Sequence, residues 1–427
     1  MNRRRPFRPF FLALALSGLA LPSLAGDWTA WRGPQHNGAI EAKGAFPDEG
    51  MGLEVVWSRP LGSGYSGLSI AENRLVTFFT DGKSDLLVAL EATTGEELWR
   101  HRISAMTPGI DGAHDGPLST PIVHGETVFG LGAGGEFFAV RLKDGQEVWR
   151  RSLVEEVGAA RPHFGFTTTP LVFEDSLLVL TGGTEERAVT AFDQATGAVR
   201  WSRVQGRIDY QSPTLADLAG KKQLVITYRG GAAGLDPKNG DVLWSHPFEG
   251  NGSASPLVLD GDRFLLTSHH GATLFHLEKQ ASSFVVEEVW TNQSFKGNVA
   301  TAVYHEGFLY SFDGDFLACV RAEDGERVWK SRPPGGKGLI LVDGHLVIFG
   351  SQGDVVVAEA TPEGYRERAR TKVDEQGGFT APSFAHGNVF VRNLQKIAAV
   401  RVHPAAMKES APASTQKTEP AKTQSES

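Results

Sequence analysis

A short motif recurs along most of the chain and constrains its fold more than any other feature. Five segments place a glycine four residues before a tryptophan, and these tryptophans are Trp99, Trp149, Trp201, Trp244 and Trp329. Trp57 and Trp290 end similar apolar segments without the glycine. Successive tryptophans are separated by 42, 50, 52, 43, 46 and 39 residues. A self-similar period of this length indicates a repeat architecture.

A second signature precedes most of these tryptophans by roughly 30 residues. It reads STP, TTP, QSP and ASP at 119–121, 168–170, 211–213 and 254–256, with TAV and TAP as relatives at 301–303 and 380–382. Between the two signatures, apolar residues alternate or cluster in short runs that are separated by turn residues, which is typical of antiparallel strands. Asp-Gly, Thr-Gly and Asn-Gly steps suit the hairpin before each final strand.

A four-stranded unit of about 40–45 residues is the period of a β-propeller blade. We therefore expect an all-β, eight-bladed propeller over residues 53–404, and seven blades is the alternative if one unit is miscounted. The last unit, 379–402, lacks a fourth strand, which the strand 53–58 would supply. The eighth final strand, near 365–370, has no tryptophan. The expected first strands begin near Tyr65, Leu118, Phe166, Gln211, Ser253, Val299, Leu339 and Phe379.

The two ends of the chain differ from the repeats. Residues 1–25 combine three early arginines, an apolar run from Phe10 to Leu21 and Ser23-Leu24-Ala25, which predicts a signal peptide cut after Ala25. A retained membrane anchor is the alternative. We expect an irregular arm over 26–52 and a disordered tail over 405–427, because the tail is rich in Ala, Ser, Thr, Pro and Lys. The protein is then periplasmic or secreted, and the residue directly after the cleavage site is Gly26 and not the cysteine that would carry a lipid.

Charge and cysteine content exclude several classes of protein. Four arginines lie in residues 1–25, so cleavage changes the formal net charge from −8 to −12. An acidic body lacks the basic face that nucleic acids or anionic membranes require. A single cysteine excludes a disulfide scaffold and a multi-cysteine metal site. We expect no nucleic-acid partner, no stable membrane insertion after cleavage, and a monomer.

The D-x-x-[T/N]-G-x-x-x-W endings, the S/T-P openings and the segment WRGPQHNG at 31–38 resemble the PQQ-like β-propeller repeat proteins. That superfamily includes quinoprotein alcohol and glucose dehydrogenases and the outer-membrane assembly lipoprotein BamB. The resemblance implies that seven tryptophans dock neighbouring blades: Trp57, Trp99, Trp149, Trp201, Trp244, Trp290 and Trp329.

The dehydrogenases of this superfamily hold PQQ beside Ca²⁺ in the central funnel, on a flat tryptophan and near a basic aspartate. Here Cys319 is alone, so the adjacent-cysteine disulfide of many alcohol-oxidising members cannot form. Seven of nine tryptophans are assigned to contacts between blades, and Trp28 and Trp31 lie in the arm. We therefore expect no cofactor and no enzyme activity, with PQQ and Ca²⁺ as the alternative.

Loops between blades and between middle strands gather at one mouth of a propeller funnel. We name their polar residues the mouth rim: Asp111, His114, Asp115, Arg161, His163, Arg207, Asp209, Tyr210, Tyr228 and Arg229. Such a set could bind a metal, a carboxylate or an extended peptide. The alternative is that these residues only satisfy solvated turns. We expect no metal site, because adjacent strand residues such as His269 and His270 point to opposite faces, and Asp313-Gly314-Asp315 is typical of a turn.

The leading hypothesis is an exported, non-catalytic propeller that binds a protein or a small molecule at its funnel mouth. The alternatives are a divergent PQQ- and Ca²⁺-dependent dehydrogenase and a BamB-like assembly factor. Fold alone does not decide among them.

Overall fold

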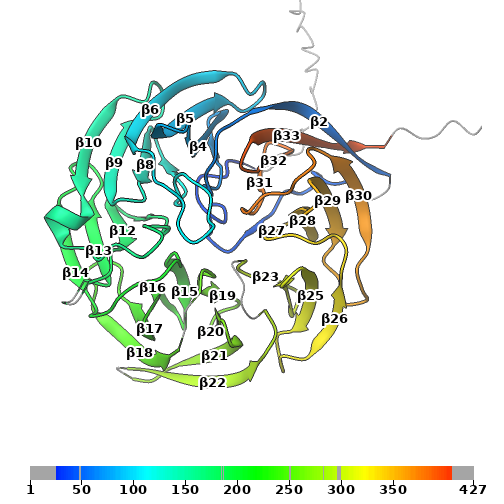
Figure 1. Ribbon diagram of the computed structural model, residues 1–427. Coiled ribbons are helices and arrows are strands. Elements are labelled where there is room, and N and C mark those ends of the chain that lie inside the picture. Colours follow the sequence, from blue (N-terminus) through cyan, green and yellow to red (C-terminus); the bar gives the residue numbers. More distant parts are fainter. Residues whose placement is uncertain are drawn as a thin grey trace, which may run out of the picture.

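Eight β-sheets form a closed ring in the computed structural model, which describes residues 26–47, 50–183, 185, 187–249, 252–281, 283–295 and 300–405. Figure 1 shows the blades following one another around the ring in chain order. Within the described residues the count is eight blades, which confirms the all-β, eight-bladed prediction over the seven-bladed alternative. The predicted signal peptide and residues 406–427 of the predicted tail lie outside the described residues.

Each blade has four antiparallel strands, numbered here from the funnel outward. The first four blades are β3–β6 (Ser69–Ala71, Arg74–Thr80, Ser84–Glu91, Glu97–Ala105), β7–β10 (Ile122–His124, Thr127–Leu131, Glu136–Arg141, Glu147–Ser152), β11–β14 (Leu171–Phe173, Ser176–Leu180, Val189–Asp193, Val199–Arg203) and β15–β18 (Thr214–Leu218, Lys221–Tyr228, Gly230–Leu235, Val242–Phe248). The next three are β19–β22 (Leu257–Val258, Arg263–Ser268, Gly271–Lys279, Phe284–Asn292), β23–β26 (Val303–His305, Phe308–Asp313, Phe316–Arg321, Arg327–Ser331) and β27–β30 (Leu339–Val342, His345–Phe349, Asp354–Glu359, Glu367–Lys372).

The eighth blade joins the two ends of the ring. Its inner strands are β31 (Ser383–Ala385), β32 (Asn388–Arg392) and β33 (Lys396–Pro404), and its outermost strand is β2 (Met51–Pro60) from the beginning of the chain. The antiparallel register runs from Met51 opposite Pro404 to Pro60 opposite Lys396. The segment predicted to complete the last unit does so, and it extends two residues further at each end. This pairing protects the edge of β33 and ties the ends of the ring together.

The innermost strands begin later than the sequence predicts in six of the eight blades, and the start predicted near Val299 for the sixth blade lies outside the described residues. They start at Ser69, Ile122, Leu171, Thr214, Leu257, Val303, Leu339 and Ser383, so only Leu339 matches. Proline lacks the N–H that a strand pair needs. A proline stands directly before five of these strands: Pro121, Pro170, Pro213, Pro256 and Pro382. The described residues that were predicted as strand starts instead lie in loops at the mouth of the funnel: Tyr65, Leu118, Phe166, Gln211, Ser253 and Phe379.

The tryptophan contacts explain why the glycine–tryptophan motif repeats. Six of the seven indoles donate a hydrogen bond of 2.8–3.1 Å to a backbone carbonyl of the next blade, namely Trp57 to Ala92, Trp99 to Leu142, Trp149 to Gln194, Trp201 to Lys238, Trp290 to Ala322 and Trp329 to Thr361. For five of the six, the hairpin glycine of that next blade lies on the indole face; the exception is Trp329, because no atom lies within 4 Å of a Cβ built on Gly364. Gly145, for example, has φ +70°, and a Cβ there would lie 2.5 Å from the Trp99 ring.

Trp244 is the exception, and its neighbour explains it. The next blade has no glycine in its outer hairpin, so the indole N–H donates to Gln223 Oε1 within its own blade at 2.8 Å. The ring stacks on Phe264 of the next blade, with centroids 5.0 Å apart. In the blade without a tryptophan, Ala369 pairs with Val357 at the corresponding position of β30.

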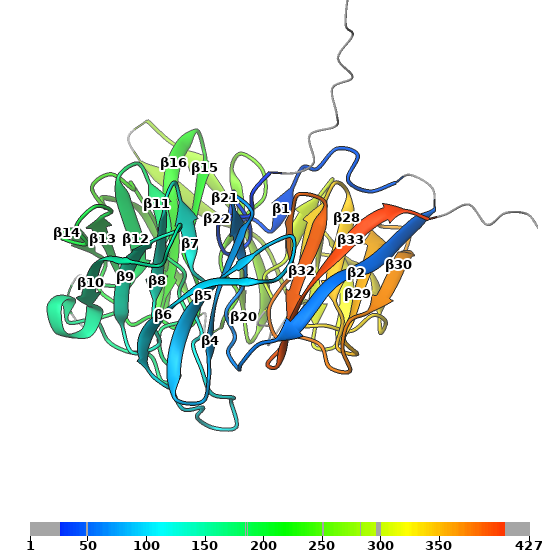
Figure 2. The same ribbon diagram turned by 90° about the horizontal axis from the view of Figure 1, so that it is seen from above.

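The described part of the predicted arm crosses the face of the ring opposite the mouth (Figure 2). Trp28 exchanges two backbone hydrogen bonds with Ile70, at 2.9 and 2.7 Å. β1 (Ala39–Ile40) then pairs in parallel with the carboxyl end of β27, so this blade has a fifth strand. Between them the buried Arg32 donates to the carbonyl oxygens of Thr301 and Ala302 at 3.0 and 2.6 Å. The arm therefore closes this end of the central channel.

Helical structure is minor. In the part of the chain that the structure describes, one π-helical turn, η1 (Leu153–Val157), precedes the loop to the third blade. No helix there is long and apolar enough to cross a membrane.

Candidate functional site at the funnel mouth

The S/T-P openings form a ring of hydroxyl groups around the central channel. A backbone N–H of one blade donates to a hydroxyl oxygen of the next at 2.9–3.0 Å, from Gly67 to Thr120, Thr169 to Ser212, Ser212 to Ser255 and Ser255 to Thr301. These hydroxyls satisfy backbone donors that the inner strand edge would leave unpaired. The repeated serine and threonine residues therefore link blades. We call this belt the hydroxyl ring.

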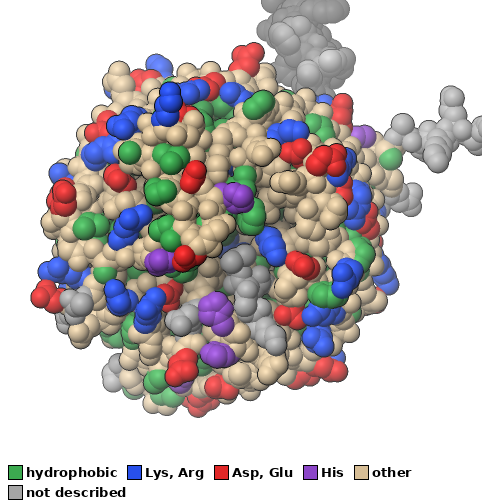
Figure 3. Space-filling model, in the orientation of Figure 1, with side chains coloured by type: hydrophobic (Ala, Val, Ile, Leu, Met, Phe, Trp, Pro, Cys, Tyr) green, Lys and Arg blue, Asp and Glu red, His purple; other side chains and the backbone are tan. Residues whose placement is uncertain are grey.

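A pocket of about 570 Å³ opens at the mouth, where the loops before the inner strands meet the loops between the middle strands. Figure 3 views the molecule in the orientation of Figure 1, and several histidines lie around the centre of that face. We call the cavity the mouth pocket. Its lining residues are Tyr65, Ala113, Leu118, Phe164, Thr167, Asp209, Tyr210, Arg229, Gly252, Ser253, His269 and Phe379.

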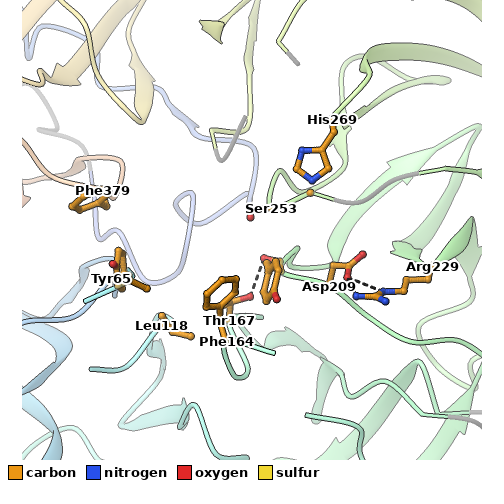
Figure 4. A pocket seen from close by; sticks show the side chains of 12 residues that line it. Tyr65, Leu118, Phe164, Thr167, Asp209, Arg229, Ser253, His269 and Phe379 are labelled. Atoms are coloured by element: carbon orange, nitrogen blue, oxygen red, sulfur yellow. Dashed lines mark hydrogen bonds and ion pairs between the residues drawn. The ribbon is translucent and has the colours of Figure 1, made fainter. Parts of the chain in front are cut away.

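One wall of the mouth pocket is aromatic (Figure 4). The Tyr65 and Phe379 rings meet edge to face with centroids 5.3 Å apart, and the Phe164 and Tyr210 rings lie 5.5 Å apart at 56°. Leu118 lies between the two pairs in this view. Phe379 is 45% exposed, which is high for a phenylalanine. This wall offers apolar surface that nothing in the described chain covers.

The other wall is polar and centres on an ion pair. The Asp209 side chain is only 5% exposed. Arg229 Nε donates to its Oδ1 at 2.9 Å, and Arg229 Nη2 forms an ion pair with the same oxygen at 2.8 Å. The Arg229 side chain is 54% exposed, and its remaining guanidinium N–H groups have no partner among the described residues. His269 lies on the same side (Figure 4). The exposed charge of this wall is therefore the guanidinium of Arg229.

Two long loops between blades are tied together beside the pocket. His163 Nε2 lies 2.8 Å from Asp111 Oδ2, which joins the loop before the second blade to the loop before the third. The backbone N–H of His114 donates to the Tyr65 hydroxyl at 2.8 Å, so the first of these loops is also held to an aromatic residue of the pocket. Both contacts fix the edge of the opening.

The structure divides the predicted mouth rim into three groups. Asp209, Tyr210 and Arg229 line the mouth pocket, and Asp111, His114 and His163 lie at its edge. Three of the remaining four make local hydrogen bonds: Asp115 Oδ1 accepts from the Gly109 N–H, Arg161 Nε donates to the Ala133 carbonyl, and the Arg207 carbonyl accepts from the Arg229 N–H. The fourth, Tyr228, packs against the hydrophobic core, and burial raises its pKa.

Sequence reasoning missed most of the aromatic wall. Tyr65, Leu118 and Phe379 were predicted as starts of inner strands, and Phe164 was not singled out. The signal that could have found three of them is position, because each stands four residues before the first residue of an inner strand. Outside the mouth pocket, Asp313 forms an ion pair with Lys330 at 2.8 Å, as suits a turn residue.

The described residues do not fit a quinone–calcium site. No group of three or more His, Cys, Asp or Glu side chains gathers in the part of the chain that is described. The carboxylate of the mouth pocket, Asp209, is engaged by Arg229. Trp31 lies beside Gly67, whose N–H donates to Thr120 of the hydroxyl ring, and Trp28 is buried in the arm. No indole therefore lines the mouth pocket where a quinone ring would need a flat support.

Comparisons with known proteins agree on the fold. The profile of the family described as "Outer membrane protein assembly factor BamB" matches residues 48–151 and 82–331. BamB from Yersinia pestis is 22% identical over 365 residues, covering 79% of this chain and 86% of the relative. The crystal structure of BamB from Moraxella catarrhalis has a TM-score of 0.60 and 14% identity, covering 82% of this chain and 97% of that one.

A quinohemoprotein alcohol dehydrogenase from Comamonas testosteroni is similar to the same degree. It has a TM-score of 0.65 and 13% identity, and the match covers 88% of this chain and 80% of that one. At such identities the solved structures show a shared fold alone.

Proposed function

The chain belongs to the family of BamB-type outer membrane protein assembly factors, and from this premise we propose that it is a non-catalytic binding scaffold of the bacterial cell envelope. The predicted signal peptide would deliver it to the periplasm, and the mouth pocket would hold a segment of a partner protein. Its role in that compartment would resemble that of an assembly factor, with the propeller presenting a rigid binding surface.

The observation that carries this proposal is the contrast between the two ends of the channel. The arm covers one end, and Arg32 fixes it there through two backbone carbonyls. The other end opens into the mouth pocket, with an uncovered aromatic wall and the exposed guanidinium of Arg229. A concave apolar surface with a few polar groups is typical of binding sites.

The rigidity of the site supports binding of a partner. The pocket-lining loops connect strands of blades that are held to their neighbours by the hydroxyl ring and by the tryptophan contacts. A surface held in one arrangement loses little entropy when a partner docks. Since the described lining does not fit a quinone–calcium site, we propose no redox step.

Co-purification from cell envelopes tests the proposal. We expect the tagged protein to recover a specific envelope protein, and a double Phe379→Ala, Arg229→Gln variant to lose it. The control is Arg401→Gln, since Arg401 is also 54% exposed and also lies near a carboxylate, Glu54, on the outer strand pair. Equal recovery by all three proteins would contradict binding at the mouth. The same experiment asks whether the recovered protein belongs to the outer-membrane assembly machinery.

A further inference from the structure

The mouth pocket has two chemically different walls that face the same space (Figure 4). The aromatic wall carries two ring pairs that meet at steep angles, Tyr65 with Phe379 and Phe164 with Tyr210. Aromatic rings prefer edge-to-face or offset contacts, so an arriving ring can extend either pair. This wall suits an aromatic group of a ligand.

The polar wall suits an acidic group. Asp209 is buried, and its Oδ1 accepts a hydrogen bond from Arg229 Nε and forms an ion pair with Arg229 Nη2, which holds the guanidinium in place. Arg229 keeps guanidinium N–H groups that have no partner among the described residues, and its side chain is about half exposed. Guanidinium groups bind carboxylates with strong, charge-assisted hydrogen bonds. His269 and Ser253 add further donors along the same side.

We infer that the mouth pocket binds an extended peptide in which an aromatic residue stands next to an acidic one. The aromatic side chain lies between the two ring pairs, and the carboxylate contacts Arg229. This inference rests on the proposed function, because it names the part of a partner protein that the scaffold would hold. The pocket is open at the mouth, so the flanking peptide can extend out of it.

The size of the pocket agrees with this ligand. A volume of about 570 Å³ falls within the roughly 300–1,000 Å³ typical of small-ligand sites, and a dipeptide unit with one aromatic side chain fills part of it. Phe379 and Arg229 are about half exposed, so substitutions there leave the hydrophobic core of the blades unchanged.

Fluorescence anisotropy with a labelled peptide, Gly-Ser-Phe-Asp-Gly-Ser, tests the inference on the mature protein. We expect saturable binding that weakens about tenfold when the phenylalanine of the peptide becomes alanine or its aspartate becomes asparagine. Phe379→Ala and Arg229→Gln should weaken it by a similar factor, whereas Arg401→Gln should not. Because Arg229→Gln leaves Asp209 buried without its partner, the double variant Asp209→Asn, Arg229→Gln is measured beside it.

The outcomes separate this inference from the proposed function. No binding of the peptide, or binding that ignores all mouth variants, overturns the inference. The inference is also overturned if the peptide does not bind and a glycan such as maltohexaose does, with binding that depends on Phe379 and Arg229. If the peptide fails but mouth-dependent co-purification succeeds, the proposed function stands with a different ligand. If the peptide binds but no envelope protein co-purifies, the ligand chemistry stands and the proposed function fails.

Discussion

The contact between Gly145 and Trp99 predicts how far one added methyl group between two blades lowers the free energy of unfolding. Gly145 has φ +70°, and a Cβ built on it lies 2.5 Å from Cε3 of Trp99. The left-handed backbone costs an alanine about 1–2 kcal/mol, and overpacking against a fixed ring costs about 1–3 kcal/mol more. An alanine also restricts the unfolded chain, which returns roughly 0.5–1 kcal/mol. We expect Gly145→Ala to lower the free energy of unfolding by about 2–4 kcal/mol.

Gly125 in the same blade is the matched control. It has φ +54°, and no atom lies within 4 Å of a Cβ built there. Gly125→Ala should therefore cost only the backbone term, about 1 kcal/mol. Urea denaturation followed by far-UV circular dichroism measures both variants.

A double-mutant cycle separates the clash from the backbone strain. Trp99→Ala removes the ring that the new methyl group meets, so Gly145→Ala should cost about 1–3 kcal/mol less in that background. If Gly145→Ala and Gly125→Ala are equally destabilising, or if the cycle shows no coupling, Gly145 is not required to make room for Trp99 of the preceding blade. Our explanation of the repeated glycine–tryptophan motif is then refuted.

Three further predictions follow from the arm and from the pocket. Arg32→Ala should lower stability by about 2–4 kcal/mol, because it leaves the buried carbonyls of Thr301 and Ala302 without their donor; a thermal melt that matches the unsubstituted protein would contradict this. Burial lowers the pKa of His36 to about 4, so the neutral ring is favoured in the folded state, and the stability that this ring contributes should be complete above about pH 6.5 and fall by roughly 3 kcal/mol by pH 4. His36→Gln should remove this part of the pH dependence, and an unchanged profile would contradict the prediction. Titration with PQQ and Ca²⁺ should leave tryptophan fluorescence unchanged, whereas saturable, Ca²⁺-dependent quenching would favour the dehydrogenase alternative.

The fold could be predicted because its constraints recur in sequence. Each motif glycine contacts the tryptophan of the blade before it, and six of the seven tryptophans donate to the blade after them, so contact geometry fixes a spacing that can be counted. The same reasoning found the strand 53–58 that completes the last blade. It could not foresee that Trp244 bonds to Gln223, because that depends on a hairpin in another blade.

The candidate site was predicted only in part, since it lies in the loops that do not repeat. Asp209 and Arg229 stood out as charged loop residues, but their pairing depends on how two loops of neighbouring strands meet. Phe379 and Tyr65 looked like strand residues, because apolar side chains ahead of a strand have the same composition as the strand itself. The path of the arm depends on Arg32, whose burial among backbone carbonyls leaves no pattern in the sequence.

Photo-crosslinking in living cells tests the central claim, that a partner protein binds at the mouth, most directly. The crosslinking amino acid p-benzoylphenylalanine replaces Phe379 in one strain and Val148 in another, because both side chains are about half exposed and Val148 lies on the outer strand of the second blade. We predict a discrete protein adduct from position 379 and none from position 148. Adducts of equal yield from both positions, or an adduct from position 148 alone, would contradict the claim.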